Sequence, residues 1–288
     1  MSTRIFVTLT IILLTLLVQR SPTSVSSSTP SSKPHVIPPS TLLQGDAACV
    51  YRPSVQRFFC DTARDGGDAE VVVQFGLASD IPLLGDIDGD GRDDPCVYRP
   101  SVQRFFCDTA RDGGDAEVVV QFGLASDIPL LGDIDGDGRD DPCVYRPSVQ
   151  RFFCDTARDG GDAEVVVQFG LASDIPLLGD IDGDGRDDPC VYRPSVQRFF
   201  CDTARDGGDA EVAVQFGLAS DIPLLGDIDG DGRDDPCVYR PSVQRFFCDT
   251  ARDGGDAEVV VQFGVSGDIP LIGSLGQPFG VALPLVVR

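Results

Sequence analysis

Short apolar runs dominate the chain from residue 42 onward, and glycine, proline and acidic residues separate them. Four runs recur in the same order, IPLLGDI, CVYRPS, QRFFCDT and EVVVQFG, and they concentrate Val, Ile, Phe and Tyr. β-branched and aromatic residues favour strands, and the turn residues between runs indicate where strands end. No helical period is sustained beyond the N-terminal region. The pattern therefore predicts an all-β fold of short strands.

Two segments are expected to connect consecutive strands within each group of four. Arg52-Pro53-Ser54 is predicted to turn the second run into the third. Asp65-Gly66-Gly67-Asp68 has the composition of a hairpin turn between the third run and the fourth.

The group of four runs is itself a repeat with a period of 47 residues. The segment VYRPSVQRFFCDTARDGGDAEV begins at Val50, Val97, Val144, Val191 and Val238 and is identical in all five copies. The next residue is Ala213 in the fourth copy and valine in the others. The segment QFGLASDIPLLGDIDGDGRDDPC links the copies and occurs four times. Four strands in about 47 residues is the size of one β-propeller blade. The sequence therefore predicts a β-propeller of four-stranded blades.

The two ends of the repeat array predict how the ring closes. The copy at residues 49–76 has a poor first strand, whereas residues 268–273 (DIPLIG) provide an additional first strand. Docking of DIPLIG onto that copy would complete five blades and remove the exposed sheet edges. Two alternatives stay open: TLLQG fills the place and DIPLIG is a loose cap, or the repeats form an open array.

The N-terminal part of the chain predicts a secreted or cell-surface protein. In residues 1–20, Arg4 precedes an apolar run at residues 5–18, which suits a signal peptide. The run is short for a membrane span, which needs about 20 residues, and an uncleaved anchor is the alternative. Residues 21–41 are rich in Ser, Thr and Pro and predict a flexible linker. Residues 42–288 would then form the propeller.

The amino-acid composition argues against several classes of function. The chain has 23 Lys+Arg against 46 Asp+Glu, a formal net charge of −23, and nucleic-acid binding needs a basic surface instead. The only histidine, His35, lies in the linker, and no histidine is available to activate Ser54 or its copies. An active site normally needs one asymmetric group of residues, whereas the acidic elements repeat unchanged. We therefore do not expect an enzyme.

The clearest chemistry lies in the nine-residue loop DIDGDGRDD, which first occurs at residues 86–94. Carboxylates at positions 1, 3, 5 and 9 converge when a glycine at position 6 permits a sharp turn, and the carbonyl at position 7 adds an oxygen. A ligand set of hard oxygens favours Ca²⁺, and about four ions are expected. The predicted ligands are Asp86, Asp88, Asp90, Arg92 and Asp94; Asp133, Asp135, Asp137, Arg139 and Asp141; Asp180, Asp182, Asp184, Arg186 and Asp188; and Asp227, Asp229, Asp231, Arg233 and Asp235.

The alternative is a solvated acidic turn, in which five aspartates within nine residues repel one another. Asp93, at position 8, is expected to face solvent. The fifth copy of the loop is absent, because neither residues 45–48 nor residues 273–276 carry the carboxylates. The loop is not an EF-hand, since position 12 is Val97 rather than glutamate and a strand follows.

These motifs carry a family resemblance. The segments QFG (74–76), DIP (80–82) and GDIDGDGRDD, followed by VYRPS, resemble the FG-GAP/VCBS repeat of integrin-α-like propellers and many secreted bacterial proteins. The resemblance covers about 240 residues, and it departs from the family motif at residues 77–79. It implies a propeller in which the same aspartates bind Ca²⁺ between the first two strands of a blade. Some proteins that carry such repeats are lectins or adhesion proteins.

Ten cysteines form five C-x10-C pairs, one in each repeat. The midpoint of Cys49 and Cys60 falls at the turn between two adjacent strands, which places the two thiols opposite each other with Cβ atoms ~5 Å apart. An oxidising compartment would then favour five disulfides within blades. The alternatives are ten free thiols, or zinc, for which each repeat provides only half a site. The pairs are Cys49 and Cys60, Cys96 and Cys107, Cys143 and Cys154, Cys190 and Cys201, and Cys237 and Cys248.

Two hypotheses of function follow. In the first, the protein is a binding or adhesion module whose identical clefts between blades bind carbohydrate or an extracellular protein with avidity. Tyr51, Arg52 and Arg57, with their copies, are candidates for contact with such a ligand, although blade packing and surface charge would also explain them. In the second hypothesis, the ions and disulfides only hold a structural scaffold. No nucleic acid and no membrane, apart from an uncleaved anchor, is expected as a partner.

Overall fold

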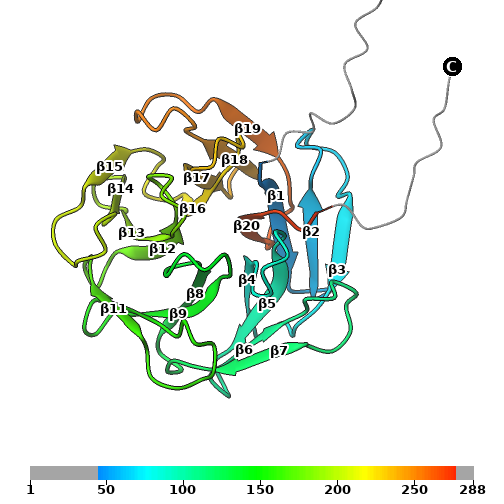
Figure 1. The fold of residues 1–288 in the computed structure, drawn as a ribbon. Coiled ribbons are helices and arrows are strands. Elements are labelled where there is room, and N and C mark those ends of the chain that lie inside the picture. The colour runs from blue at the N-terminus through cyan, green and yellow to red at the C-terminus, as the bar shows by residue number, and fades with distance from the viewer. Residues whose placement is uncertain (1–44, 277–288) are drawn as a thin grey trace, which may run out of the picture. The chain divides into compact units, whose positions relative to one another are not determined.

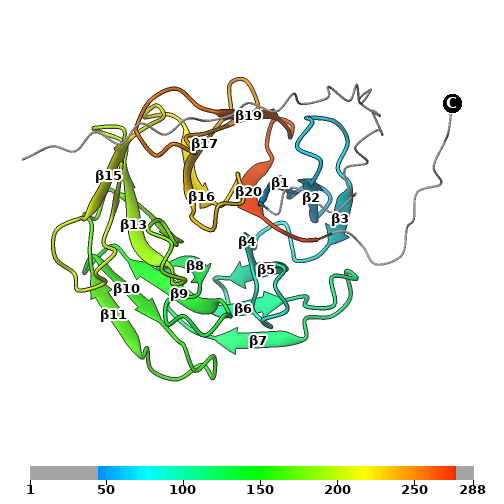
Figure 2. The ribbon, with the colours of Figure 1, turned by 45° about the horizontal axis from the view of Figure 1, so that its top comes forward.

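The computed structural model describes residues 45–276, so the predicted signal peptide (1–20) and linker (21–41) lie outside the described residues. All regular structure in the described part is β-strand. Twenty strands form five four-stranded antiparallel sheets, which are arranged as blades around a central axis (Figures 1 and 2). No helix among the described residues has the length and apolar character that membrane crossing requires.

The blades are numbered in chain order, and each is given from the axis outward. Blade 1 contains β20 (Ile269–Gly273), β1 (Ala47–Arg52), β2 (Arg57–Asp61) and β3 (Val71–Gln74). Blade 2 contains β4 (Ile81–Gly85), β5 (Asp94–Arg99), β6 (Arg104–Cys107) and β7 (Val118–Gln121). Blade 3 contains β8 (Ile128–Gly132), β9 (Asp141–Arg146), β10 (Arg151–Cys154) and β11 (Val165–Gln168).

Blades 4 and 5 follow the same order. Blade 4 contains β12 (Ile175–Gly179), β13 (Asp188–Arg193), β14 (Arg198–Cys201) and β15 (Val212–Gln215). Blade 5 contains β16 (Ile222–Gly226), β17 (Asp235–Arg240), β18 (Arg245–Cys248) and β19 (Val259–Gln262).

The ring closes through β20, the last strand of the described chain. β20 pairs antiparallel with β1, with Leu271 opposite Cys49, and so completes blade 1. The innermost strands β4, β8, β12, β16 and β20 each contact the next one around the axis. The prediction of a five-bladed propeller closed by DIPLIG is therefore confirmed. The open array is wrong, and TLLQG cannot fill a place that β20 occupies.

The second strand of each blade is buried on both faces, because its side chains alternate between two neighbouring blades. Tyr51 packs with Phe58 of its own blade, at 4.9 Å between ring centroids, and with Val97 of blade 2. Val50, the preceding residue, packs instead against Tyr239 and other apolar residues of blade 5. The tyrosine hydroxyl donates to the carbonyl of Leu77, 3.0 Å away. Period-2 alternation thus joins each blade to both neighbours.

This packing decides between the two interpretations of the tyrosines in favour of blade packing. Tyr51 and three of its copies are fully buried, and the last copy, Tyr239, is 2% exposed. None of the five therefore offers a surface to a ligand. The hydroxyl is satisfied inside the protein. The five copies, which instead join adjacent blades, are Tyr51, Tyr98, Tyr145, Tyr192 and Tyr239.

All five predicted disulfides are present, and no cysteine is free. Cys49 and Cys60 lie directly opposite each other in the register of β1 and β2, with Cα atoms 4.1 Å apart. The four other pairs repeat this arrangement. The alternatives of free thiols and zinc are therefore wrong.

One turn is as predicted and one is not. Residues 53–56 form the tight turn between β1 and β2, with Gln56 at a φ of 56°. The connection from β2 to β3, in contrast, is a loop at residues 62–70 and not a tight hairpin turn at Asp65-Gly66-Gly67-Asp68. The buried Asp61 organises this loop, because its carboxylate accepts hydrogen bonds from the N–H groups of Asp65 and Gly66. In blade 2 the equivalent loop is residues 108–117, hereafter the arginine loop because it carries Arg111.

Candidate metal centre

Each acidic loop connects the innermost strand of a blade to the second strand. In blade 2 it follows β4, and its last residue, Asp94, is the first residue of β5. Gly91, at position 6, has a φ of 81°, and a Cβ atom there would meet no neighbouring atom. The glycine is therefore needed for backbone conformation and not for space, as predicted.

Asp86 organises the loop around its own carboxylate. Its Oδ1 accepts hydrogen bonds from the N–H groups of Gly89 (2.7 Å) and Asp90 (3.0 Å), and its Oδ2 accepts one from Gly91 (2.7 Å). The same contacts recur around Asp133, Asp180 and Asp227. Four loops of identical sequence therefore fold in the same way.

The loop places three carboxylates at ligand distance from one another. One oxygen each from Asp86, Asp88 and Asp94 lie within 4.8 Å of one another. Asp94 is fully buried; its Oδ2 accepts the N–H of Ile87, while its Oδ1 has no hydrogen-bond donor of suitable geometry. An ion with oxygen ligands at 2.3–2.6 Å fits such a cluster. The other clusters are Asp133, Asp135 and Asp141; Asp180, Asp182 and Asp188; and Asp227, Asp229 and Asp231.

The buried aspartate is strongly perturbed. Burial raises the pKa of Asp94 to about 7, the charges of Asp88 and Asp86 raise it further, and Arg111 opposes the shift. The pKa values of Asp141, Asp188 and Asp235 are likewise raised to about 7, with burial as the main cause. A cation that binds beside such a carboxylate lowers the free energy of its charged form.

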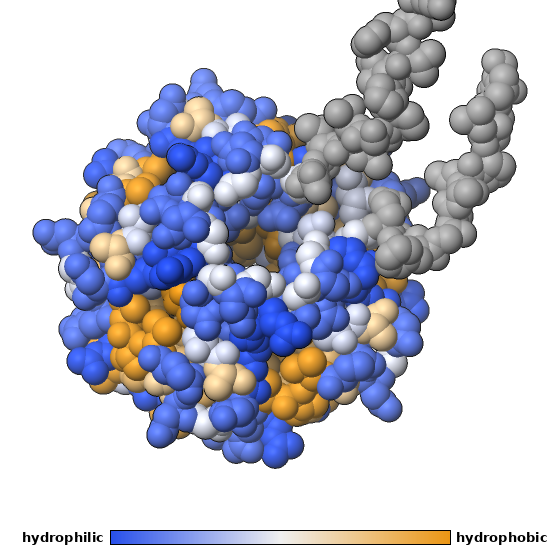
Figure 3. Space-filling model, in the orientation of Figure 1, coloured by the Kyte–Doolittle hydropathy of each residue, from blue (hydrophilic) through white to orange (hydrophobic). Residues whose placement is uncertain are grey.

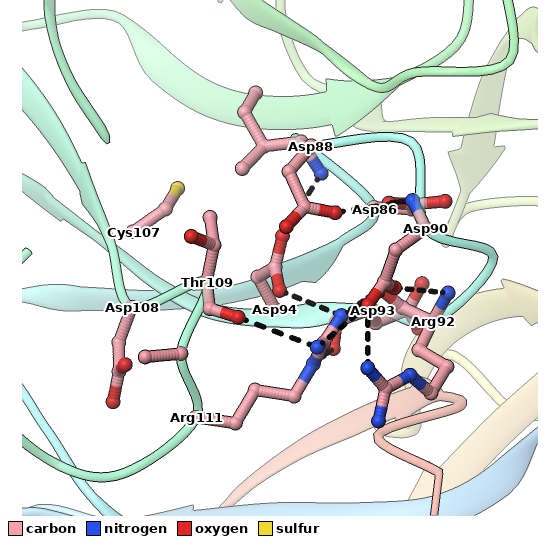
Figure 4. A network of polar contacts seen from close by, with 12 residues as sticks. Asp86, Asp88, Asp90, Arg92, Asp93, Asp94, Cys107, Asp108, Thr109 and Arg111 are labelled. Carbon is pink, nitrogen blue, oxygen red and sulfur yellow. Dashed lines mark hydrogen bonds and ion pairs between the residues drawn. The ribbon is translucent and has the colours of Figure 1, made fainter. Parts of the chain in front are cut away.

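A cation from elsewhere in the sequence enters the loop. Arg111 extends from the arginine loop into the acidic loop of the same blade (Figure 4). Its Nη2 lies 2.7 Å from Asp90 Oδ1 and 2.9 Å from Asp94 Oδ1, and it donates to the carbonyl of Arg92 at 2.7 Å. Its Nε donates to the carbonyl of Asp93 at 2.9 Å. This contact was not predicted from the sequence, in which Arg92 is the only basic residue adjacent to the aspartates.

The predicted ligands therefore divide into two groups. Asp86, Asp88 and Asp94 converge, whereas Asp90 and the carbonyl of Arg92 face Arg111. The hydrogen bond from Arg111 is the main reason that the pKa of Asp90 is lowered to about 2. In the last loop the cluster differs, because Asp231 at position 5 joins positions 1 and 3.

The aspartate at position 8 was expected to face solvent, and this prediction is wrong. Asp93 binds the backbone of the neighbouring blade: its N–H donates to the carbonyl of Ser274 (2.9 Å), and its Oδ2 accepts the N–H of the same residue (2.7 Å). Burial raises the pKa of Asp93 to about 6. A Cβ atom added to Gly273 would lie 2.2 Å from Asp93 Oδ2, so the glycine at the end of β20 makes this approach possible.

Asp46 makes the same contact between blades 1 and 5. Its N–H donates to the carbonyl of Asp227 at 2.7 Å, and its Oδ2 accepts the N–H of Asp227 at 3.0 Å. Asp140 is bonded in the same way to Asp86. The five position-8 residues, hereafter the clamp aspartates, are Asp46, Asp93, Asp140, Asp187 and Asp234.

Clefts of about 360 to 950 Å³ lie between four pairs of adjacent blades. Between blades 1 and 2, the walls are residues 74–77 on one side, and Arg99, Phe106 and residues 113–116 on the other. Arg99 lies over the ring of Phe106, 4.5 Å from its centroid, and donates two hydrogen bonds to Asp80. Figure 3 shows apolar patches among hydrophilic ones on one face of the ring.

The two arginines predicted to contact a ligand, Arg52 and Arg57, lie in different environments. The copies of Arg52, namely Arg99, Arg146, Arg193 and Arg240, line the clefts, and Arg52 itself is bonded to Asp268 in the same manner. Arg57 is exposed and donates to the side chain of Gln74.

No family model matches the sequence, and no curated protein is significantly similar to it. Among solved structures, the chain is similar to an Agrocybe aegerita lectin described as recognising non-reducing terminal N-acetylglucosamine, with 15% identity and a TM-score of 0.41. The match covers 67% of this chain and 56% of the lectin chain. The chain is also similar to the Photorhabdus luminescens Tc holotoxin pore, with 19% identity and a TM-score of 0.37, over 64% of this chain and 9% of that one. Both resemblances are partial, and neither bears on what this chain binds.

Proposed function

We propose that the protein is a secreted or cell-surface calcium-binding β-propeller of the FG-GAP/VCBS type that acts as a binding or adhesion module. The observation that carries the calcium site is the cluster of three carboxylates within 4.8 Å, which in blade 2 includes the fully buried Asp94. Its Oδ1 lies 2.9 Å from Arg111 but accepts no hydrogen bond of suitable geometry. Five disulfides agree with an oxidising compartment outside the cytosol.

In the first three loops, the carboxylates at positions 1, 3 and 9 would hold the ion, and in the last loop those at positions 1, 3 and 5. In blade 2 these are Asp86, Asp88 and Asp94, and Asp90 and the carbonyl of Arg92 would complete the oxygen set. A bound Ca²⁺ would neutralise neighbouring carboxylates and connect the loop to the start of β5. We assign the ion a structural role, because it would connect the loop to the second strand of the blade and the same loop is repeated four times.

The clefts between blades support the binding role. Their walls combine guanidinium, carboxylate and glutamine groups with phenylalanine rings, a mixture that suits the hydroxyls and apolar faces of a carbohydrate or the surface of an extracellular protein. Repetition around the ring would add avidity to weak individual sites. One observation favours the scaffold instead: Arg99 is already satisfied by Asp80 and Phe106.

The calcium site is tested by native mass spectrometry and thermal unfolding. We expect four Ca²⁺ ions per chain and a lower Tm after chelation. Alanine at position 3 of all four loops should lower the Tm in millimolar Ca²⁺ to that of the chelated wild type. The variant is D88A/D135A/D182A/D229A, and the charge-matched control, in exposed residues outside the loops, is D115A/D162A/D209A/D256A.

A wild type that is metal-free in calcium buffer, with the same Tm in chelator, would refute the site. The binding role is tested separately on a glycan array and on cell surfaces, with and without chelator. Binding to neither would leave the scaffold as the function.

A further inference from the structure

The guanidinium of Arg111 lies among the oxygens that would bind the ion. We propose that Arg111 and its copies are built-in competitors of the divalent cation: each guanidinium neutralises its acidic loop when no ion is bound and must leave when one binds. The copies are Arg158, Arg205 and Arg252. This inference rests on the proposed calcium site.

The two cations would share three of the five predicted ligand positions. Arg111 contacts Asp90, the carbonyl of Arg92 and Asp94, which are positions 5, 7 and 9 of the loop. Arg205 and Arg252 repeat these contacts at 2.6 to 3.0 Å. The guanidinium N–H groups and Ca²⁺ would compete for the lone pairs of these oxygens, and the two positive charges repel each other. Occupation by one cation therefore excludes the other.

Displacement of the arginine has a cost that the ion must overcome. The Arg111 side chain is only 10% exposed, and its hydrogen bonds to the loop are charge-assisted. The guanidinium supplies one positive charge and planar donors, whereas Ca²⁺ supplies two charges and takes six to eight oxygens. The ion is therefore the stronger partner of the carboxylates, but its measured affinity includes the loss of the arginine contacts.

Loops of identical sequence hold the guanidinium in two arrangements. In blade 3, Arg158 donates from Nη1 to Asp141 at 2.7 Å and from Nη2 to both oxygens of Asp137 at 2.6 Å. Its Nε has no partner, whereas the Nε of Arg111 donates to the carbonyl of Asp93. The arginine can thus rearrange within the loop while the fold stays the same.

Blade 1 provides an internal control. Arg64 has the repeat position of Arg111, but its blade has no acidic loop. It donates instead to the carbonyl of Ile228 in the loop of blade 5. Substitution of Arg64 therefore removes the same side chain from the same loop type without freeing a set of calcium ligands.

The test is isothermal titration of the chelator-treated protein with CaCl₂. The variant is R111Q/R158Q/R205Q/R252Q, and the control is R64Q. We expect the quadruple variant to bind Ca²⁺ about tenfold more tightly per site or better, because the charge-assisted bonds no longer have to be broken. The R64Q variant should bind like the wild type.

The outcomes separate this inference from the proposed function. If the wild type binds Ca²⁺ and the folded quadruple variant binds no more tightly, the arginines do not compete and the calcium site stands. If only the variant binds, competition is supported and calcium binding by the wild type is rejected. If neither binds, both proposals fail.

A second measurement uses only the wild type and therefore tests the proposal even if the quadruple variant does not fold. In ¹⁵N spectra of the wild type, the Nε–H signals of the four arginines should shift as Ca²⁺ is added, while that of Arg57, which is bonded to Gln74 outside the acidic loops, should not. Saturation with Ca²⁺ without a shift of the four signals would overturn the inference.

Discussion

Blade 1 and blade 2 have the same strands but not the same loop. In blade 1, position 1 is Ser274 and position 9 is Ala47, so the predicted ligands are absent there. The clamp aspartate of this blade, Asp46, is nevertheless present and bonded, and its aromatic pair has the same 4.9 Å spacing as that of blade 2. The contacts that build and join blades are therefore separable from those that would hold an ion.

Among the features that all five blades share, the disulfides should have the largest effect on stability. Removal of one bridge, in C49S/C60S of blade 1 or C143S/C154S of blade 3, should cost about 3 kcal/mol, because each bridge closes a short loop in the unfolded chain. Denaturant unfolding in chelator should give the same loss for both variants. A much smaller loss of unfolding free energy in blade 1 would indicate that closure by β20, and not the absence of an ion, sets this blade apart from the others.

The clamp aspartates should have the next largest effect. Asp46→Ala removes the acceptor of the Asp227 N–H and should lower the free energy of unfolding by about 1 kcal/mol. Asp46→Asn retains a side-chain acceptor and removes a charge. Its stability at pH 7.5 should therefore be at least that of the wild type, as measured by urea unfolding in chelator. Equal destabilisation by Ala and Asn would show that the charge, and not the acceptor, matters.

The same residues predict how stability changes with pH. Burial raises the pKa of Asp46 and, to about 6, that of Asp93 above their unfolded values. Between about pH 4 and pH 6 the folded chain then binds more protons than the unfolded chain, so in chelator its stability should fall as the pH rises through this window. Tm measured against pH checks this, and Asp46→Asn should reduce the slope.

The pairing of strands and of cysteines could be predicted from the sequence, whereas side-chain contacts between loops and between blades could not. The strands, the blade and the disulfides follow from patterns within one repeat, and the closing strand follows from the incomplete copy at residues 49–76. The positions of Arg111 and Asp93 do not. Arg111 reaches Asp94 across the sheet, and Asp93 binds a residue of another blade, so neither contact is visible in the spacing within a loop. For Tyr51 the sequence left ligand contact and blade packing both open, because the covering residue, Val97, belongs to the next blade.

Chelation should affect blade 2 and leave the equivalent edge of blade 1 unchanged. Hydrogen exchange at residues 86–94 should accelerate about tenfold or more in chelator, while residues 47 and 48 of β1 should exchange at the same rate. A smaller change is expected in the arginine loop, residues 108–117, because Arg111 returns to the acidic loop when the ion leaves. Equal acceleration in blade 1 would mean that the ions stabilise the whole ring and not individual loops.

The smallest effect concerns an attempt to restore the site in blade 1. S274D/A47D places carboxylates at positions 1 and 9, but position 3 is Gly276, which has a φ of 65°. A Cβ atom there would lie 2.5 Å from Cδ of Arg92, so the backbone and the adjacent loop both oppose a third carboxylate. Two carboxylates cannot enclose an ion that takes at least six oxygens. Native mass spectrometry of this variant should therefore count the same number of Ca²⁺ ions as the wild type, and one additional ion would mean that two carboxylates with water suffice.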